Sequence, residues 1–547
     1  MDKIALTSAS SGTSPHEAGV RDFAPTLKPS QLEFRIRLAV KRLHSYPADS
    51  LDFIMEDLEH PKDSIRHAHH CTADMTGRTI EFFGEAMQLL PDLDRKPAEM
   101  LFERMLKAAP ASPHLARRFY PYYRLTKDRR ALATILENLE RCEAAAKSAE
   151  GPASFDSPWA SVIEGMADRY AETRDRRWLD LAEAYQEPSL KTAGRHAHGR
   201  LTVLRALLKM ARVSGERKFL DRVESEYPEL LDAEHADGSI AETLPDSFRT
   251  EGCSIGDWLI LNLRRWDLLR DGRSLDRAEH TLVNALWFNQ FVTGGFGHRD
   301  FLGRGYDSGV EEAWWCCTMS GGMAMCEFAR HAVQLVDGVI RINFLVPGIY
   351  RLDDGKDAMT VDLDSSYPAR YEATVKTVGA GGREVVFRVP GYVKNAKTSR
   401  EGDVWTLQGD IGHHAEKRRG GWTVKYGPLM LAPMIYYWKN VGKVSEDVPK
   451  GYVPESIEPE GFAVVEPKEK DGNGFWKVRG GAAGLPEWPA YDDGRNSRTG
   501  TDFLAPAWLE TVDGAGVRRE LYFQPMSYQT SNLTLRYVPM VFGLIER

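Results

Sequence analysis

Residues 250–266 read TEGCSIGDWLILNLRRW, and this stretch indicates how the chain folds. Large side chains recur here at the spacing of one face of an α-helix, at Ile255, Trp258, Leu259, Asn262 and Trp266. Glu251 and Cys253 come just ahead of this helix and are two residues apart, so on an extended segment both side chains point to the same side. The stretch therefore predicts a helix with a carboxylate and a thiol at its start.

The same helical period continues on both sides of this stretch, from about residue 32 to residue 336. Apolar stripes occur, for example, at Leu32, Ile36, Val40 and Leu43, and again at Leu201, Leu204 and Leu208. Short breaks such as Gly151-Pro152 separate these stripes. Many helices joined by short connections predict helical hairpins packed in a ring or a bundle.

Beyond residue 336 the apolar period changes to two. Met359, Val361 and Leu363 alternate with polar residues, and residues 371–375 and 385–389 behave in the same way. Half-buried strands punctuated by Gly and Pro predict a β-sandwich. The expected organisation is a disordered segment over residues 1–30, a helical catalytic domain over 31–336, a β-sandwich domain over 337–440 and a C-terminal β-rich region over 441–547.

Composition narrows the class of function. The chain has 547 residues and a formal net charge of −8, which argues against a nucleic acid or an anionic membrane as partner. It lacks the run of about eighteen apolar residues that a membrane helix needs. Residues 1–30 contain no apolar core of a secretory signal, so a cytoplasmic protein is expected. The six cysteines are too few and too irregular for a disulfide framework, and thiols kept reduced for metal binding or catalysis fit better.

Residues 314–317, WWCC, place two thiols side by side. A disulfide between neighbouring residues is strained, so either both thiols face one site or one is buried away from it. With Glu251 and Cys253 the pair would give four ligands, the number and softness that tetrahedral zinc accepts. The pattern leaves an alternative open: two core cysteines packed beside aromatic side chains, with Glu251 only a favourable partner of the helix dipole.

Glu251-Gly252-Cys253, followed about sixty residues later by Cys316-Cys317, resembles glycoside hydrolase family 127, the β-L-arabinofuranosidases and their relatives. Further matches follow in the same order as in the family: His196-Ala197, Asn262–Trp266, Val389-Pro390-Gly391 and Tyr426-Gly427-Pro428-Leu429. The resemblance covers roughly residues 60–440.

This resemblance implies an all-α (α/α)6-barrel catalytic domain followed by all-β sandwich domains. It implies Zn²⁺ as the cofactor, with four ligands: Glu251, Cys253, Cys316 and Cys317. Cys316, the first of the pair, would be the nucleophile of a retaining exo-glycoside hydrolase that releases β-L-arabinofuranose or a related sugar from plant glycans or glycoconjugates. The chemistry is sound from first principles, because only a thiolate attacks and zinc holds a thiol deprotonated at neutral pH.

A retaining mechanism also needs a general acid near the nucleophile. The family has a Glu upstream of its Glu-x-Cys element. Here Glu242 is the nearest match, and Glu234 is the second choice. The alternative for Glu242 is a solvated carboxylate on a surface turn.

Four further residues are expected to bind the sugar: His196, His298, Asp74 and Trp314. His196 matches the family's active-site His, and His298 lies in a Gly-rich stretch expected to be a loop ahead of the Cys pair. Asp74 opens an expected helix and has the role of a helix N-cap as its alternative. Trp314 offers a stacking surface for a sugar, with a place in the core as its alternative.

The chain also departs from the family. The family's Cys-x-Cys-Cys-Pro-x-Asn run reads WWCCTMS here, over residues 314–320. A divergent branch with a different sugar is therefore expected. Two other functions stay open: a metal-free (α/α)6 carbohydrate enzyme of the uronyl-hydrolase type, and a non-catalytic carbohydrate-binding or scaffold protein with a structural zinc. A carbohydrate is the expected partner in each case. The sequence leaves the oligomeric state open, with a homodimer as one possibility.

Overall fold

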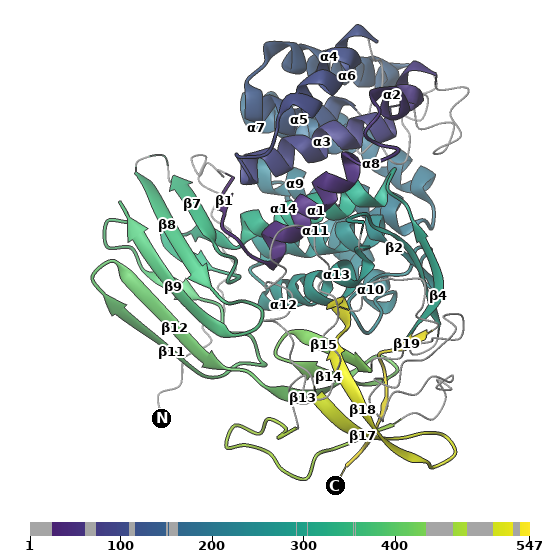
Figure 1. Cartoon of the computed structure of the whole chain (residues 1–547). Helices are drawn as coiled ribbons and strands as arrows, with labels where there is room; N and C mark the ends of the chain where they lie inside the picture. The colour runs from purple at the N-terminus through teal and green to yellow at the C-terminus, as the bar shows by residue number, and fades with distance from the viewer. Residues whose placement is uncertain are drawn as a thin grey trace.

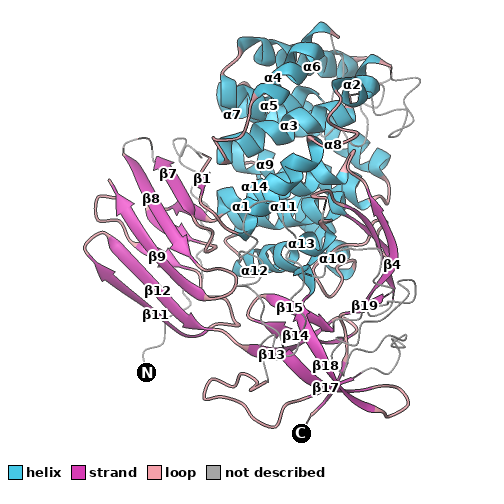
Figure 2. Cartoon of the chain, in the orientation of Figure 1, coloured by secondary structure: helices cyan, strands magenta, loops and turns pink. Residues whose placement is uncertain are grey.

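The computed structural model describes residues 24–60, 73–108, 115–148, 151, 162–291, 293–302, 305–353, 355, 357–433, 463–478, 507–528 and 537–546. The helices gather in one part of the molecule and most of the strands in another, as Figures 1 and 2 show. A helical N-terminal part and a β-rich C-terminal part were both predicted, and both are confirmed. Within the segment expected to be disordered, Thr26–Leu27 form strand β1, which pairs with β7.

The centre of the helical part is a closed ring. Its members are α3 (Asp74–Leu89), α5 (Leu115–Thr126), α7 (Val162–Thr173), α9 (Ala197–Ser214), α11 (Gly252–Leu269) and α14 (Cys317–His331). Each of these helices contacts the next, and α14 contacts α3. Arg78, His198, Cys253 and Ser320 meet at the first turns of α3, α9, α11 and α14, so these four ring helices point the same way.

Other helices cover the outside of this ring. They are α1 (Gln31–Leu43), α2 (Leu51–Glu59), α4 (Lys96–Lys107), α6 (Arg129–Lys147), α8 (Arg177–Ala193), α10 (Arg217–Asp232), α12 (Gly272–His280), the π-helix η2 (Thr281–Leu286) and α13 (Trp287–Asn289). Capping side chains explain where several of them begin: Ser30 accepts a hydrogen bond from the Glu33 amide, and Asp271 accepts one from the Arg273 amide. None of the helices that the structure describes combines the length and apolar composition that a membrane crossing requires.

Burial follows the predicted helical period. Ile255, Trp258 and Leu259 on α11 are fully buried, and Ile36 on α1 is fully buried as well. α11 is buried on nearly all sides because it packs against α9 and α14 in the ring and against α12 outside it, which is why its sequence is apolar on more than one face.

The strands that the structure describes form four sheets. A six-stranded sheet has the order β1-β7-β8-β9-β12-β11, with β7 (Gly348–Asp353), β8 (Ala358–Ser365), β9 (Tyr371–Val378), β11 (Lys394–Glu401) and β12 (Val404–Asp410). A three-stranded sheet consists of β10 (Val385–Phe387), β6 (Val339–Ile342) and β5 (Val333–Val336). The predicted alternation is confirmed in β8, where Met359, Val361 and Leu363 are buried.

A seven-stranded sheet has the order β13-β14-β15-β18-β17-β16-β20. Its strands are β13 (His413–Arg418), β14 (Gly421–Tyr426), β15 (Leu429–Pro433), β16 (Ala463–Val465), β17 (Ala507–Val512), β18 (Arg518–Pro525) and β20 (Gly543–Ile545). Asn284 on η2 joins this sheet to the outer helices, because its side chain donates to the Pro428 carbonyl at 3.1 Å and accepts from the Met430 amide at 2.8 Å.

The fourth sheet corrects the expectation that residues 31–336 are all helical. β2 (Arg249–Glu251), β3 (Gly297–Leu302) and β4 (Gly305–Glu312) lie within this range, and β19 (Tyr537–Pro539) joins them from near the C-terminus. Sequences such as GHRDFL and GYDSGVEE show little alternation of apolar and polar residues. These strands could therefore not be predicted from an apolar period of two. His298 therefore lies in a strand, and the prediction that it lies in a loop is wrong.

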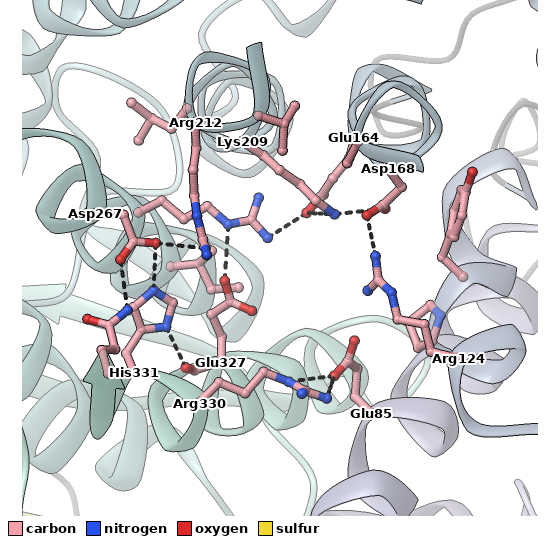
Figure 3. Close-up of a pocket in the computed structure, with 18 of the residues that line it drawn as sticks. Glu85, Arg124, Glu164, Asp168, Lys209, Arg212, Asp267, Glu327, Arg330 and His331 are labelled. Carbon is pink, nitrogen blue, oxygen red and sulfur yellow. Dashed lines mark hydrogen bonds and ion pairs between the residues drawn. The ribbon is translucent and has the colours of Figure 1, made fainter. Parts of the chain in front are cut away.

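Charged side chains surround a cavity of about 480 Å³ that extends toward the C-terminal ends of the ring helices (Figure 3). Within the described residues, ten of the lining residues are Arg or Lys and seven are Asp or Glu. The ion pairs include Lys209 with Asp168 at 2.7 Å and His331 with Asp267 at 3.1 Å. Each helix C-terminus carries about half a negative charge, and the ring brings such ends together. The excess of Arg and Lys around the cavity compensates this negative charge.

Candidate metal centre and active site

Three thiols meet where α11 and α14 begin. The Sγ atoms of Cys253 and Cys317 are 3.6 Å apart, and those of Cys316 and Cys317 are 3.7 Å apart. All three ligand atoms lie within 4.8 Å of one another, and all three residues are buried. The predicted cluster of Cys253, Cys316 and Cys317 is therefore present in the fold.

The local sequence explains how the two helix starts come so close. Gly252 opens α11, and a Cβ at this position would lie 2.9 Å from Cβ of Phe296, 3.0 Å from Oδ1 of Asn289 and 3.0 Å from Cβ of Cys317. Only glycine fits this contact without displacing its neighbours. Cys316 is the N-cap of α14, and the Cys317 amide donates to the Ala313 carbonyl at 2.9 Å. The Glu-Gly-Cys element thus lets two helix N-termini share one small space.

Glu251 lies between two histidines. Its Oε1 is 3.6 Å from Nε2 of His196, and its Oε2 is 3.4 Å from Nε2 of His298. His298 is the direct partner of Glu251 in the pairing of β2 with β3. His196 caps α9, since its Nδ1 accepts a hydrogen bond from the Gly199 amide at 3.2 Å, and this directs its Nε2 toward Glu251.

The donor set fits a bound metal ion. Glu251 is buried, and its Oε1 has no hydrogen-bond partner among the described residues. A buried carboxylate oxygen without such a partner is costly unless a cation satisfies it. A ligand atom of Glu251 also lies within 4.8 Å of those of Cys317 and His298. Three thiols and one carboxylate are a set that zinc accepts.

Electrostatics single out Cys316 among the thiols. Hydrogen bonds from Cys253 and Cys317 lower the pKa of Cys316 to about 5, and the nearby Arg78 guanidinium acts in the same direction against the effect of burial. Burial raises the pKa of the Cys253 thiol to about 12 and that of Cys317 well above its usual range. Cys316 is thus the thiol whose surroundings best favour a thiolate.

Glu242 lies beside this cluster. Its ligand oxygen is within 4.8 Å of those of His196 and Glu251. Burial raises the pKa of the Glu242 carboxyl, and the negative charge of Glu251 raises it further. Glu234, the second choice for the acid, is engaged elsewhere, because it accepts hydrogen bonds from Trp258 at 3.1 Å and from Arg277 at 3.0 Å.

Comparisons with known proteins agree on the architecture. No protein-family model and no curated protein sequence matches the chain. A solved β-L-arabinofuranosidase of family GH127 from Geobacillus stearothermophilus T6 is 11% identical, with a TM-score of 0.70 over 96% of this chain and 100% of its own. Another GH127 β-arabinofuranosidase is 13% identical, with a TM-score of 0.68 over 96% of this chain and 98% of its own.

A third solved protein, described as a glycoside hydrolase, is 11% identical, with a TM-score of 0.67 over 97% of this chain and 98% of its own. This chain has the GH127 fold. At such low identities the likeness establishes the fold, and the chemistry has to be argued from the residues themselves.

Two of the residues expected to bind the sugar, Asp74 and Trp314, lie outside the cluster around Glu251. Asp74 is the first residue of α3 and is fully buried; Ala73, not Asp74, is the N-cap. The carboxylate of Asp74 accepts from Arg78 at 2.8 Å and from Arg118 at 3.3 Å, so its visible role in the GH127 fold is to hold two guanidinium groups.

Trp314 is partly buried near the start of α14. Its ring centroid lies 4.9 Å from that of Phe53 on α2 and 5.5 Å from that of Trp315. Arg42 lies over the same ring at 5.8 Å. These contacts form a small aromatic surface two residues from Cys316, which fits a stacking role for a ring-shaped group.

The sequence did not single out the residues behind the thiols. Arg78 donates to Ser320 Oγ at 2.9 Å and to Cys253 Sγ at 3.7 Å, and it contacts His198 Nε2 at 2.9 Å. His198 in turn contacts Asp257 at 2.6 Å through Nδ1. The only available signal was that Arg78 and Asp257 are charged residues on otherwise buried helix faces.

Proposed function

We propose that this protein is a retaining exo-glycoside hydrolase with Cys316 as nucleophile, and that it releases β-L-arabinofuranose or a related sugar from plant glycans or glycoconjugates. The proposal rests on one observation above all: a GH127 fold in which three thiols, Glu251 and Glu242 converge. We also infer that the ring and its outer helices form an (α/α)6 barrel, which is followed by β-sandwich domains. The cytoplasm is the proposed location of the protein.

We infer that Zn²⁺ is the cofactor, held by Glu251, Cys253, Cys316 and Cys317. When bound, zinc would supply a positive charge that keeps buried thiols deprotonated at neutral pH. Glu251 Oε1, which lacks a hydrogen bond among the described residues, is the oxygen available to it. His196 and His298 flank this carboxylate and orient it.

In the first step, Cys316 Sγ attacks the anomeric carbon of the sugar. A C–S bond forms while the glycosidic C–O bond breaks, and the electron pair of that bond goes to the leaving oxygen. Glu242 gives its proton to this oxygen, a role that suits a carboxyl whose pKa is raised by burial and by Glu251. The product of the step is a thioglycosyl enzyme and a free alcohol.

In the second step, the Glu242 carboxylate takes a proton from water, and the oxygen of that water attacks the anomeric carbon. A C–O bond forms, the C–S bond breaks, and Cys316 returns as the thiolate. Two displacements at one carbon retain its configuration. His196, exposed on 29% of its side chain, is available to contact sugar hydroxyls, and Trp314 to stack on a sugar ring.

The test is hydrolysis of p-nitrophenyl β-L-arabinofuranoside by the reduced, zinc-loaded protein, beside a panel of other furanosides and pyranosides. Cys316→Ala is the test variant, and Cys142→Ala, at another buried cysteine, is its matched control. We expect turnover of one sugar, a loss of about 1,000-fold or more in Cys316→Ala, and unchanged activity in Cys142→Ala. Turnover that survives in folded Cys316→Ala would contradict a cysteine nucleophile.

The panel also separates the other two functions. Turnover of unsaturated uronides by a protein free of zinc would favour the metal-free barrel enzyme. Tight zinc binding without turnover of any sugar would favour the carbohydrate-binding protein with a structural zinc.

A further inference from the structure

Arg78 is a buried cation beside the thiols that has no place in the two chemical steps. Its side chain is 1% exposed, and its Nη1 lies 3.7 Å from Cys253 Sγ. Leaving a guanidinium inside a protein is costly unless anions surround it. Among the described residues, Asp74 is the carboxylate bonded to it, at 2.8 Å, and the same Asp74 oxygen also accepts from Arg118 at 3.3 Å. Arg118 is also paired with Glu81, so it has a second anion of its own, whereas the Nη1 of Arg78 faces Ser320 and the sulfur of Cys253.

The charge of the expected metal centre requires such a cation. Three thiolates and one carboxylate around a divalent ion carry a net charge of about −2. The centre is buried, with Cys253 1% exposed and Cys317 fully buried. The helix N-termini at Cys253 and Cys317 each offer about half a positive charge. About one unit of negative charge remains, and Arg78 is the guanidinium among the described residues that contacts a sulfur of the centre.

The geometry around Arg78 holds it in place. Ser320 Oγ accepts from Nη1 at 2.9 Å, and His198 Nε2 lies 2.9 Å from Nη2. Because His198 Nδ1 contacts the Asp257 carboxylate at 2.6 Å, its proton is on Nδ1, and Nε2 is the acceptor that faces Arg78. Asp257 is itself held by Thr202 at 2.9 Å and Arg205 at 2.7 Å. A chain of contacts from α9 and α11 thus fixes the guanidinium of α3 against the thiols.

We propose that Arg78 is a positioning residue of the metal centre: it neutralises the bound metal–thiolate cluster and fixes the Sγ of Cys253 through its guanidinium. This inference rests on the proposed function only in assuming a metal ion at the three cysteines. Arg78 faces Cys253 rather than the sugar, so its effect is expected in metal affinity first and in turnover as a consequence.

The experiment is a zinc titration against a competing chelator for the wild-type protein and for Arg78→Met and Arg78→Lys. Loss of an outer-shell partner typically weakens metal binding about 10–100-fold, which is the expectation for Arg78→Met. Arg78→Lys keeps the positive charge but loses the forked guanidinium, so a loss of zinc affinity between those of the wild type and Arg78→Met is expected. Co²⁺ loading gives a second readout, because the thiolate-to-cobalt absorption band reports on sulfur geometry and should shift in both variants.

Arg118→Met is the matched control. It removes another buried arginine from Asp74 but not one that contacts a sulfur, so its zinc affinity should stay within about threefold of the wild type. If Arg78→Met does not fold, Arg78→Lys and Ser320→Ala provide the test instead. Ser320→Ala removes a hydrogen bond that holds the Arg78 guanidinium, so it should weaken zinc binding about threefold to tenfold.

The outcomes separate the two proposals. Wild-type affinity and an unshifted cobalt band in a folded Arg78 variant would overturn the role of Arg78 and leave the proposed function untouched. Absence of zinc binding by the wild-type protein would overturn the metal centre, and the proposed function with it. An equal loss in Arg78→Met and Arg118→Met would assign Arg78 to general core stability and would also overturn the proposal.

Discussion

Glu251 and His298 are direct partners in an antiparallel strand pair, with 3.4 Å between Glu251 Oε2 and His298 Nε2. The sequence predicted an extended segment at Glu251 but not the strand at His298, and the pairing of the two sets the direction of the carboxylate proposed to bind zinc. Because His298 contacts Oε2, the other oxygen of Glu251, which lies 3.6 Å from His196 and has no hydrogen bond among the described residues, is the one proposed to face the cation. The sheet thus contributes to the site as much as the two helices do.

This pairing leads to a first prediction. His298→Ala should weaken zinc binding about tenfold, because an unsupported carboxylate loses its fixed orientation. Chelator competition measures the effect. Glu311→Gln is the control, since Glu311 lies 3.7 Å from the other nitrogen of His298 and its side chain is 53% exposed, so its zinc affinity should match the wild type. Equal affinities in all three proteins would show that Glu251 does not depend on His298.

The second prediction concerns the acid. Glu242→Gln should lower kcat about 100–10,000-fold for glycosides with poor leaving groups. The loss should be smaller for p-nitrophenyl glycosides, because their leaving oxygen needs little protonation. Because the pKa of Glu242 is raised, the carboxyl stays protonated to higher pH, and wild-type activity should fall as the pH rises through this raised value. The variant should lose that alkaline limb.

Glu234→Gln is the matched control for the acid. It removes a carboxylate held by Arg277 and Trp258, so it should lower the thermal midpoint while leaving kcat and the pH profile unchanged. A profile that changed in Glu234→Gln and not in Glu242→Gln would reverse the assignment of the two residues.

Local patterns explain what the sequence could and could not predict. The helices and the strand β8 follow apolar periods that burial enforces, so residues such as Ile255 and Val361 were placed correctly. The thiols could be grouped because Glu251, Cys253 and the Cys pair supply the number and kind of ligands that zinc accepts, and because their order and spacing resemble glycoside hydrolase family 127. Arg78 and Asp257 escaped notice because their partners are 120 to 175 residues away or on another helix, and no local period reports such contacts.

A third prediction tests the close approach of α11 and α14. Gly252→Ala should destabilise the protein by about 1–3 kcal/mol, because the new Cβ would lie about 3 Å from three neighbouring atoms, one of them Cys317 Cβ. Zinc affinity should fall as well, since the sulfurs are forced apart. Gly272→Ala is the control: Gly272 also opens a helix, α12, and a Cβ there meets nothing within 4 Å. A Gly252→Ala protein as stable as the Gly272→Ala protein would contradict this packing.

The last prediction concerns the charged residues near the C-terminal ends of the ring helices (Figure 3). His331 is 5% exposed and lies 3.1 Å from Asp267, which is 3% exposed. Burial opposes the charged form of His331, but Asp267 outweighs it and the pKa of His331 is raised; burial likewise opposes the Asp267 carboxylate, but His331 and Arg212 hold its pKa well below its usual range.

The signs of these two shifts define a pH window. A raised histidine pKa adds stability that is fully present below the unfolded value of about 6.5 and is lost as the pH rises through the folded pKa. The lowered pKa of Asp267 adds stability that is present above its unfolded value of about 3.9 and is lost at lower pH. Both contributions are therefore present between about pH 4 and pH 6.5.

His331→Leu should accordingly destabilise the protein by about 3–5 kcal/mol at pH 6, because it leaves the Asp267 carboxylate buried with less compensation. The loss should shrink at pH 9, where the wild-type imidazole is more nearly neutral. Thermal midpoints at both pH values measure this difference. Arg141→Ala, which breaks an exposed pair with Glu137, should cost no more than about 0.5 kcal/mol at either pH. A His331→Leu deficit of the same size at pH 6 and pH 9 would mean that its packing, and not its charge, stabilises this end of the ring.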